Sequence, residues 1–96
     1  MAELITEKEL ETKVRSFKDT STDKIIVSAS QRDDGWWVLS ITHNQIIENI
    51  EHKYLYKIKI RDENKEKGYM SLDKLAKRLK EMGIEVFAIV LSDNKN

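Results

Sequence analysis

Residues 24–42 read KIIVSASQRDDGWWVLSIT, and this stretch predicts the element around which the rest of the fold is arranged. Residues 24–30 and 35–42 are rich in the β-branched and aromatic side chains that favour strands. Between them, Asp33, Asp34 and Gly35 tolerate the left-handed dihedral angles that a tight turn needs. The stretch therefore predicts a β-hairpin.

Two adjacent tryptophans lie on the second strand of this hairpin. Side chains alternate between the two faces of a strand, so Trp37, Leu39 and Ile41 share one face, while Trp36 and Val38 lie on the other. We expect the first set to lie in the core. Trp36 then needs a second packing surface: either the N-terminal helix covers it, or it anchors a protein partner, as aromatic residues do at interface centres.

The residues before the hairpin predict a helix over residues 7–17. Thr6 and Glu9 have the spacing of a capping box, in which each side chain accepts a hydrogen bond from the other residue's backbone N–H. The apolar residues of this helix form a narrow stripe, so we expect it to cover the core rather than to lie at its centre. Residues 19–23 are polar and read as a linker.

After the hairpin, residues 53–61 predict a third strand. One of its faces is apolar and the other is cationic, with Lys57, Lys59 and Arg61 at alternate positions. Residues 45–51, which precede this strand, contain three isoleucines that fit either a helical turn or the edge of a strand. We interpret them as a connection.

The C-terminal part predicts a helix followed by a buried strand. Ser71 is a helix cap, the helix runs to Met82, and Gly83 ends it. Residues 84–91 are apolar at every position except Glu85, which is typical of a strand buried on both faces, so we expect it at the centre of the sheet. The third strand, this helix and this strand predict a right-handed crossover whose two strands run parallel.

Together these elements predict one α+β domain over residues 1–96, in the order α-β-β-β-α-β, with the helices packed on a four-stranded mixed sheet. Its parts are the N-terminal capping helix, the hairpin, a strand-helix-strand unit over residues 53–91 and a polar tail over residues 92–96. A chain of 96 residues supports one modest core. The residues that we expect in that core are Val14, Trp37, Leu39, Ile58, Leu75, Leu79, Phe87 and Ile89.

Charge is unevenly distributed in a chain whose formal net charge is zero. Residues 53–80 contain ten Lys and Arg and four Asp and Glu, whereas residues 1–23, 24–52 and 81–96 each carry a net charge of −2. A one-sided positive field favours an acidic partner. The contact residues that this pattern predicts are Trp36, Lys57, Lys59, Arg61, Lys65, Lys67, Lys74, Lys77 and Arg78.

Two functions fit this surface. The first is a non-enzymatic binding or accessory protein, with a capacity to form homo-oligomers, that contacts an acidic protein surface. The alternative is a single-stranded nucleic-acid-binding domain, in which the basic residues within 57–67 follow phosphates and aromatic residues stack on bases. The zero net charge weighs against this alternative, because dedicated nucleic-acid binders are usually basic. A third interpretation is a solvated strand whose lysines only discourage aggregation.

The sequence predicts no catalytic residue, cofactor or metal ion. The chain has no cysteine, so disulfides and thiolate ligands are excluded, and we expect a cytoplasmic protein. His43 and His52 match no metal-ligand spacing. Ser71 and Lys74 share the Ser-x-x-Lys spacing of some acyl enzymes, but the companion motifs are missing and a helix cap explains Ser71. No segment approaches the ~18 apolar residues of a membrane span, so we expect no membrane partner.

Residues 25–30, the Arg32-Asp33-Asp34-Gly35-Trp36 turn and Tyr54-Leu55-Tyr56-Lys57-Ile58 together resemble the gas-vesicle accessory protein O family. The resemblance covers about half of the chain. It implies a small non-enzymatic accessory protein that acts through protein contacts. Residues 40–45 replace an acidic run of the family, and residues 84–91 have no counterpart in its pattern, so we transfer no functional residue from it.

Overall fold

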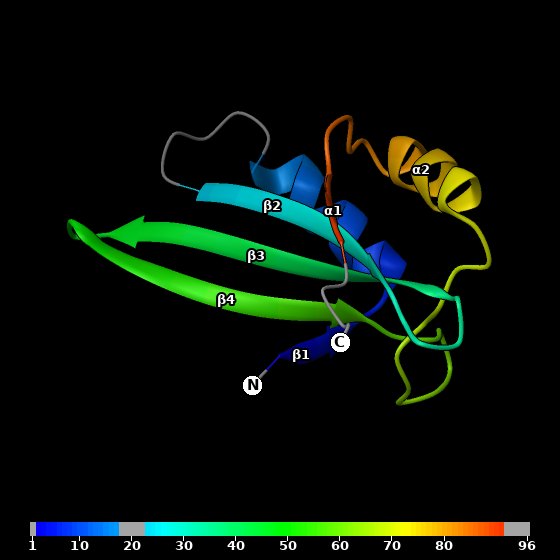
Figure 1. Ribbon diagram of the computed structural model, residues 1–96. Helices are drawn as coiled ribbons and strands as arrows, with labels where there is room; N and C mark the ends of the chain where they lie inside the picture. Colours follow the sequence, from blue (N-terminus) through cyan, green and yellow to red (C-terminus); the bar gives the residue numbers. More distant parts are fainter. Residues whose placement is uncertain (1, 18–22, 92–96) are drawn as a thin grey trace.

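Two helices pack on one face of a five-stranded mixed sheet (Figure 1). The computed structural model describes residues 2–17 and 23–91, so the predicted tail and most of the predicted linker lie outside the described residues. The elements are β1 (Glu3–Ile5), α1 (Glu7–Phe17), β2 (Asp23–Gln31), β3 (Trp37–Ile47), β4 (Ile50–Ile58), α2 (Leu72–Glu81) and β5 (Ala88–Val90). The predicted α+β class is confirmed. The predicted four strands and element order are wrong, because β1 precedes the first helix.

The strand order is β1-β4-β3-β2-β5, which places β3 at the centre. β3 is antiparallel to β2 and β4, whereas β1 pairs in parallel with β4 and β5 pairs in parallel with β2. β4 and β5 therefore run in the same direction, as predicted for the crossover, but two strands separate them. Because β5 is an edge strand, the prediction that residues 84–91 form the centre of the sheet is wrong.

Connection lengths explain the position of β5. Short turns join β2 to β3 and β3 to β4, and strands joined in this way usually become neighbours. The crossover from β4 through α2 is longer, and it ends at the free edge of β2. At that edge Ile89 and Val90 remain 44% and 52% exposed. The side chains of β5 are therefore apolar but are not buried within one chain.

The predicted hairpin of β2 and β3 is confirmed. The two strands pair from Asp23 opposite Gln45 to Gln31 opposite Trp37. In the turn, the backbone N–H of Arg32 donates to the carbonyl oxygen of Trp36 at 2.7 Å. Gly35 has a φ of +91°, a value that glycine adopts without the steric cost of a Cβ atom.

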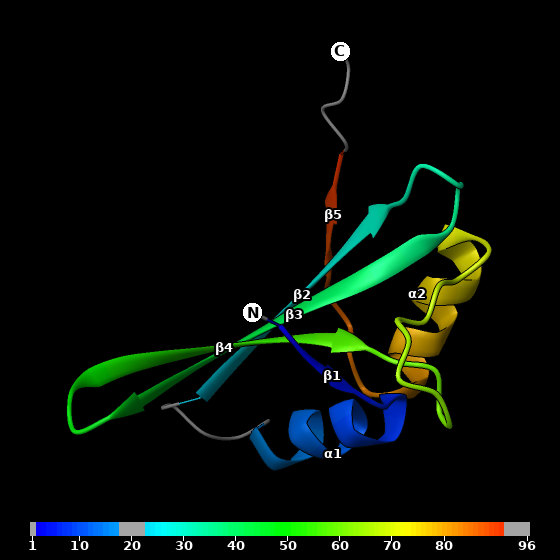
Figure 2. The same ribbon diagram turned by 90° about the horizontal axis from the view of Figure 1, so that it is seen from below.

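A second hairpin, between β3 and β4, replaces the predicted connection at residues 45–51. Ile47 pairs directly with Ile50, so only Glu48 and Asn49 form the turn, with φ values of 52° and 67°. Two left-handed residues in a two-residue turn match the right-handed twist of the flanking strands. This turn was not predicted, because two-residue turns of this kind usually contain glycine and this one consists of Glu48 and Asn49. The hairpin projects beyond the helices in Figures 1 and 2.

Both helices begin with the predicted caps. In α1 the backbone N–H of Thr6 donates to Glu9 Oε1 at 2.9 Å, and that of Glu9 donates to Thr6 Oγ1 at 3.0 Å, which confirms the capping box. In α2 the Ser71 hydroxyl accepts from the backbone N–H of Lys74 at 3.2 Å. Gly83, with a φ of +92°, follows the C-cap and ends α2 as predicted.

The core lies between the two helices and the face of the sheet that they cover. Alternate residues of the central strands contribute to it, together with Leu10 of α1 and Leu75, Leu79 and Met82 at α2. Half of the predicted core is confirmed as fully buried: Leu39, Ile58, Leu75 and Leu79. Val14, Trp37 and Phe87 are only partly buried at its border. Ile89 is an error that follows from placing β5 at the centre.

Candidate functional site

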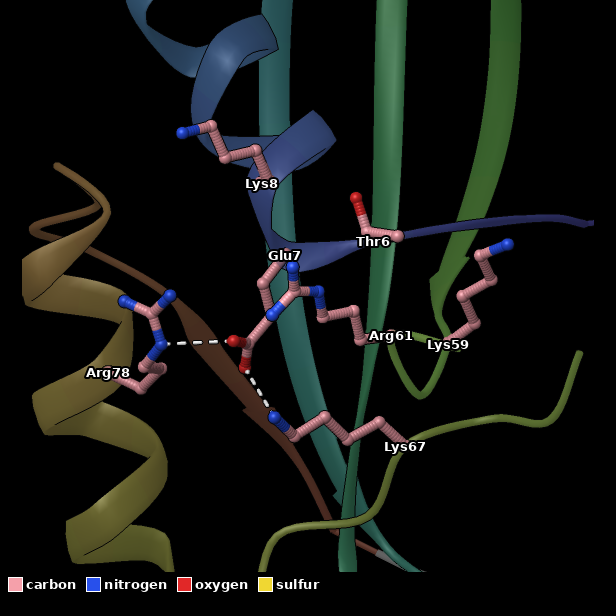
Figure 3. A pocket seen from close by; sticks show the side chains of 7 residues that line it. All are labelled: Thr6, Glu7, Lys8, Lys59, Arg61, Lys67 and Arg78. Carbon is pink, nitrogen blue, oxygen red and sulfur yellow. Dashed lines mark hydrogen bonds and ion pairs between the residues drawn. The ribbon is translucent and has the colours of Figure 1, made fainter. Parts of the chain in front are cut away.

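A pocket of about 530 Å³ lies where β1, α1, α2 and the segment after β4 meet (Figure 3). Five basic side chains and one carboxylate line it, so its formal charge is strongly positive. A concave surface of one charge concentrates the field and attracts ligands of the opposite charge. We call it the basic pocket, and its residues are Thr6, Glu7, Lys8, Lys59, Arg61, Lys67 and Arg78.

Glu7 is the residue that connects the walls of the basic pocket. Its carboxylate pairs with Arg78 Nε at 3.0 Å and with Lys67 Nζ at 3.2 Å, and it accepts a hydrogen bond from the Tyr69 hydroxyl. The side chain of Glu7 is only 15% exposed. This carboxylate is largely shielded from water and accepts from three donors. It therefore fixes the relative positions of α1, α2 and the segment between β4 and α2, which contains Lys67 and Tyr69.

The protonation states of this network are mutually stabilising. Burial alone would raise the pKa of Glu7, but the hydrogen bonds from Tyr69 and Lys67 and the charges of Lys67 and Arg78 outweigh it, so the pKa lies below its ordinary value of 4.5. Burial and the adjacent Glu7 carboxylate raise the pKa of the Tyr69 hydroxyl far above its ordinary value. Burial opposes the charge of Arg78, but Glu7 more than compensates and raises its pKa.

Three other cations of the basic pocket remain available to a ligand. Lys8, Lys59 and Arg61 form no ion pair with any carboxylate in the part of the chain that the structure describes. In Figure 3 the side chain of Arg61 extends toward Glu7, while the amines of Lys8 and Lys59 lie at the sides of the pocket. The longer-range field of Lys59 reaches Glu9, whose pKa is lowered chiefly by the hydrogen bond from Thr6.

Backbone contacts of the segment after β4 place its basic residues. The N–H of Lys59 donates to the carbonyl oxygen of Ile5 at 2.8 Å, which ties this segment to β1. The chain then turns back, so that the backbones of Lys59 and Glu66 form an isolated antiparallel β-bridge. The N–H of Lys67 donates to the carbonyl oxygen of Ile58 at 2.7 Å. Lys59 and Lys67 are therefore held on opposite arms of one turn, beside the start of α1.

Four of the nine predicted contact residues meet in the basic pocket: Lys59, Arg61, Lys67 and Arg78. The prediction that Lys57, Lys59 and Arg61 share one strand face is wrong, because β4 ends at Ile58. Lys57 instead lies on the sheet, where its amine donates to Ser40 Oγ at 2.9 Å and lies 3.7 Å from Glu66 Oε2.

The remaining predicted residues lie outside the basic pocket. Lys65 is exposed in the turn after β4, and Lys74 and Lys77 are exposed on α2. Trp36 is 40% exposed in the turn between β2 and β3, where its side chain lies directly over Gly68. Trp36 is not among the residues that line the basic pocket.

Sequence reasoning missed Glu7 and Lys8, the two charged pocket residues that α1 contributes. Both occupy the first turn of a helix that carries charged residues of both signs, so neither differs from an ordinary solvated position in the sequence. Their place in the pocket becomes visible only in the fold, where the start of α1 lies against Arg78 and Lys67, which are distant in the sequence.

His43, one of the two histidines considered above, lies in the interior. Its Nε2 atom is 2.8 Å from Asp23 Oδ1, and its ring stacks on Phe17 with centroids 4.5 Å apart. His43 is 4% exposed, so this contact joins β2, β3 and the end of α1 inside the fold. The described residues contain no group of three His, Asp or Glu side chains arranged to hold a metal ion.

Comparisons with protein-family models, curated proteins and solved structures gave no match for this chain. The resemblance to gas-vesicle accessory protein O therefore stays a prediction. None of the described helices has the length and apolar character needed to cross a membrane.

Proposed function

We propose that this protein is a non-enzymatic binding protein that holds an acidic segment of a partner protein in the basic pocket. The observation that carries the proposal is the pocket lining, in which five cations face one carboxylate. Glu7 already compensates two of these cations, Lys67 and Arg78. An acidic side chain of the partner would pair with the other three.

Two of the pocket cations are paired with Glu7 and three are not, and this difference supports a binding role over a purely structural one. Lys67 and Arg78 contact Glu7 and connect separate elements, so their charges contribute to folding. Lys8, Lys59 and Arg61 make no comparable contact in the described residues, although all three line the same concave surface. Like charges gathered in one concavity destabilise a fold modestly, and an anionic ligand relieves that repulsion.

Single-stranded nucleic acid is less well supported as the ligand. Such binding combines a basic groove with aromatic side chains on which bases stack. Among the described residues, the aromatic side chain that bonds to the pocket network is Tyr69, which is 7% exposed and donates its hydroxyl to Glu7. Trp36 is not part of the pocket lining. The pocket lining thus has the charges for phosphate, but the described residues that line it include no aromatic side chain on which bases could stack.

The test compares two charge reversals on the full chain. Lys59→Glu combined with Arg61→Glu should weaken binding of a fluorescent oligo-glutamate peptide at least about tenfold, equivalent to ~1.4 kcal/mol. The matched control is Lys74→Glu combined with Lys77→Glu, which makes the same change in net charge on the exposed side of α2. Circular dichroism spectra should show that both variants remain folded.

A labelled single-stranded oligonucleotide serves as the competing probe. Tighter binding of the oligonucleotide than of the peptide, with a steep salt dependence, would favour the nucleic-acid alternative. Equal losses in the two charge-reversal variants would mean that only the general field of the protein matters and that the basic pocket is not the site.

A further inference from the structure

β5 is an edge strand, and no described strand pairs with its far side. A free edge presents N–H and C=O groups that another strand can pair with, and proteins normally protect such edges with charged residues, proline or a bulge. Residues 86–91 contain no charged residue and no proline. In Figure 2, β5 extends beyond both helices. Among the described residues this edge is therefore open, and of the usual protections it has the shortness of the strand but neither charge nor proline.

The side chains of β5 itself are apolar on both faces of the sheet. Ile89 pairs with the buried Ala29, and Ala88 and Val90 pair with Ser28 and Ser30 on the opposite face. Val86 and Leu91, which flank the strand, are 84% and 83% exposed. Apolar residues on both faces are typical of an internal strand. Since β2 already occupies one side of β5, only a strand added on the other side would make β5 internal.

The chemistry of the edge selects its occupant. A charged strand placed along residues 86–91 would lose water from its charges and meet no compensating group. A second copy of β5 meets every requirement, because it is uncharged, apolar on both faces and equal in length. Around a two-fold axis the two strands would run antiparallel, and each would satisfy the other's free backbone groups.

We propose that the protein forms a symmetric dimer in which β5 pairs with β5 of a second copy, so that two five-stranded sheets become one continuous sheet. The dimer interface does not depend on the basic pocket, since none of its lining residues belongs to β5. Each copy would keep its pocket, which gives the dimer two sites for an acidic partner and the avidity that follows from two linked contacts.

Sedimentation velocity over a wide range of protein concentration tests the dimer. The wild-type chain should sediment at twice its mass of 11.3 kDa when concentrated and should dissociate on dilution. Val86→Lys combined with Leu91→Lys should sediment as a monomer at every concentration, because four like charges would lie close together along the interface. Both positions are exposed, so the monomer should remain folded.

The control is Ile50→Lys, which places the same charge on an exposed isoleucine of the β3–β4 hairpin, 60% exposed. This variant should remain dimeric. A wild-type chain that stays monomeric when concentrated would overturn the proposal, and so would a double-lysine variant that still dimerises. Loss of the dimer in Ile50→Lys alone would place the interface at the hairpin and would also contradict it.

Single cysteines locate the interface, because the natural chain has none. A cysteine introduced at residue 88, 89 or 90 should form a disulfide-linked dimer on mild oxidation at one of these positions, since paired residues near the two-fold axis lie within the ~4.4–6.8 Å that a disulfide bridges between Cα atoms. Leu4→Cys on the opposite edge should cross-link far more slowly. Faster linkage through residue 4 would assign the interface to β1 instead.

Discussion

The two edges of the sheet are formed by strands of equal length, yet the two strands differ in how deeply their side chains are buried. β1 and β5 each have three residues and each pair in parallel with one neighbour. At β1, Ile5 is 2% exposed and leads directly into the capped start of α1 and the ion pairs of Glu7. At β5 all three residues are exposed, and their apolar side chains form no polar contact.

The difference shows what stabilises a short edge strand. Backbone hydrogen bonds pair each of the two strands with its neighbour. β1 is held in addition by a buried side chain and by the network that Glu7 forms next to it. The same network shapes the basic pocket, so β1 is stable within the monomer and close to the proposed binding site. β5 lacks both contributions, which leaves it available to a second copy.

The largest expected effect is the difference in stability between truncating an isoleucine in β1 and truncating one in β5. Ile5→Ala should lower the free energy of unfolding by about 2–5 kcal/mol, because it leaves a cavity in the core. Ile89→Ala should cost less than about 1 kcal/mol in dilute solution, where the side chain is 44% exposed. Urea unfolding at low protein concentration measures both values. Equal losses would remove the distinction between the edges.

A second prediction concerns the network beside β1. Glu7→Gln removes the charge that Lys67 and Arg78 share and should cost about 1–3 kcal/mol, as expected for hydrogen bonds to a charged group. The control is Glu11→Gln, whose partner Arg15 is 72% exposed, so that this ion pair should contribute less than about 1 kcal/mol. If both variants unfold at the same urea concentration as the wild type, the network does not anchor this edge.

The acid dependence of stability sharpens the same point. The pKa of Glu7 is lower in the folded protein than its ordinary value of 4.5, so its contribution is complete above that pH and is lost as the pH falls through the folded pKa. The stability difference between the wild type and Glu7→Gln should therefore shrink below pH 4.5. Paired urea titrations from neutral to acidic pH measure it, and a difference independent of pH would contradict this assignment.

The smallest effect tests the junction of β1 and α1. Thr6→Ala removes one half of the capping box and should cost about 0.5–2 kcal/mol. Thr12→Ala, in the same helix, removes only a hydroxyl that donates to the carbonyl oxygen of Lys8 and should change stability by less than about 0.5 kcal/mol. Thermal unfolding of the two variants measures the contrast, and a larger loss for Thr12→Ala would exclude the capping box as a main stabiliser of this junction.

Features that depend on neighbouring residues could be predicted from the sequence. The Thr6–Glu9 capping box, the Asp-Asp-Gly turn and the Ser71 cap all form between residues a few positions apart. The β3–β4 turn is local too, but Glu48 and Asn49 lack the glycine by which such turns are recognised. β1 escaped prediction because three residues are too few to show a period.

The candidate site was predictable only in part, for a related reason. The density of lysine and arginine in residues 53–80 pointed to Lys59, Arg61, Lys67 and Arg78, because charge can be counted along the chain. The strand pattern then grouped Lys59 and Arg61 with Lys57 on one face, which fails once β4 ends at Ile58.

The sequence by itself determined the α+β class, both helices with their caps, the first hairpin and the unequal distribution of charge, since each depends on propensity, period or composition. Tertiary structure alone decided that the crossover ends beside β2, that β5 lies at an edge, and that Glu7 and Lys8 meet cations more than fifty residues away. These outcomes depend on contacts between distant residues, whose free energies compete across the whole fold and leave no periodic pattern in the chain.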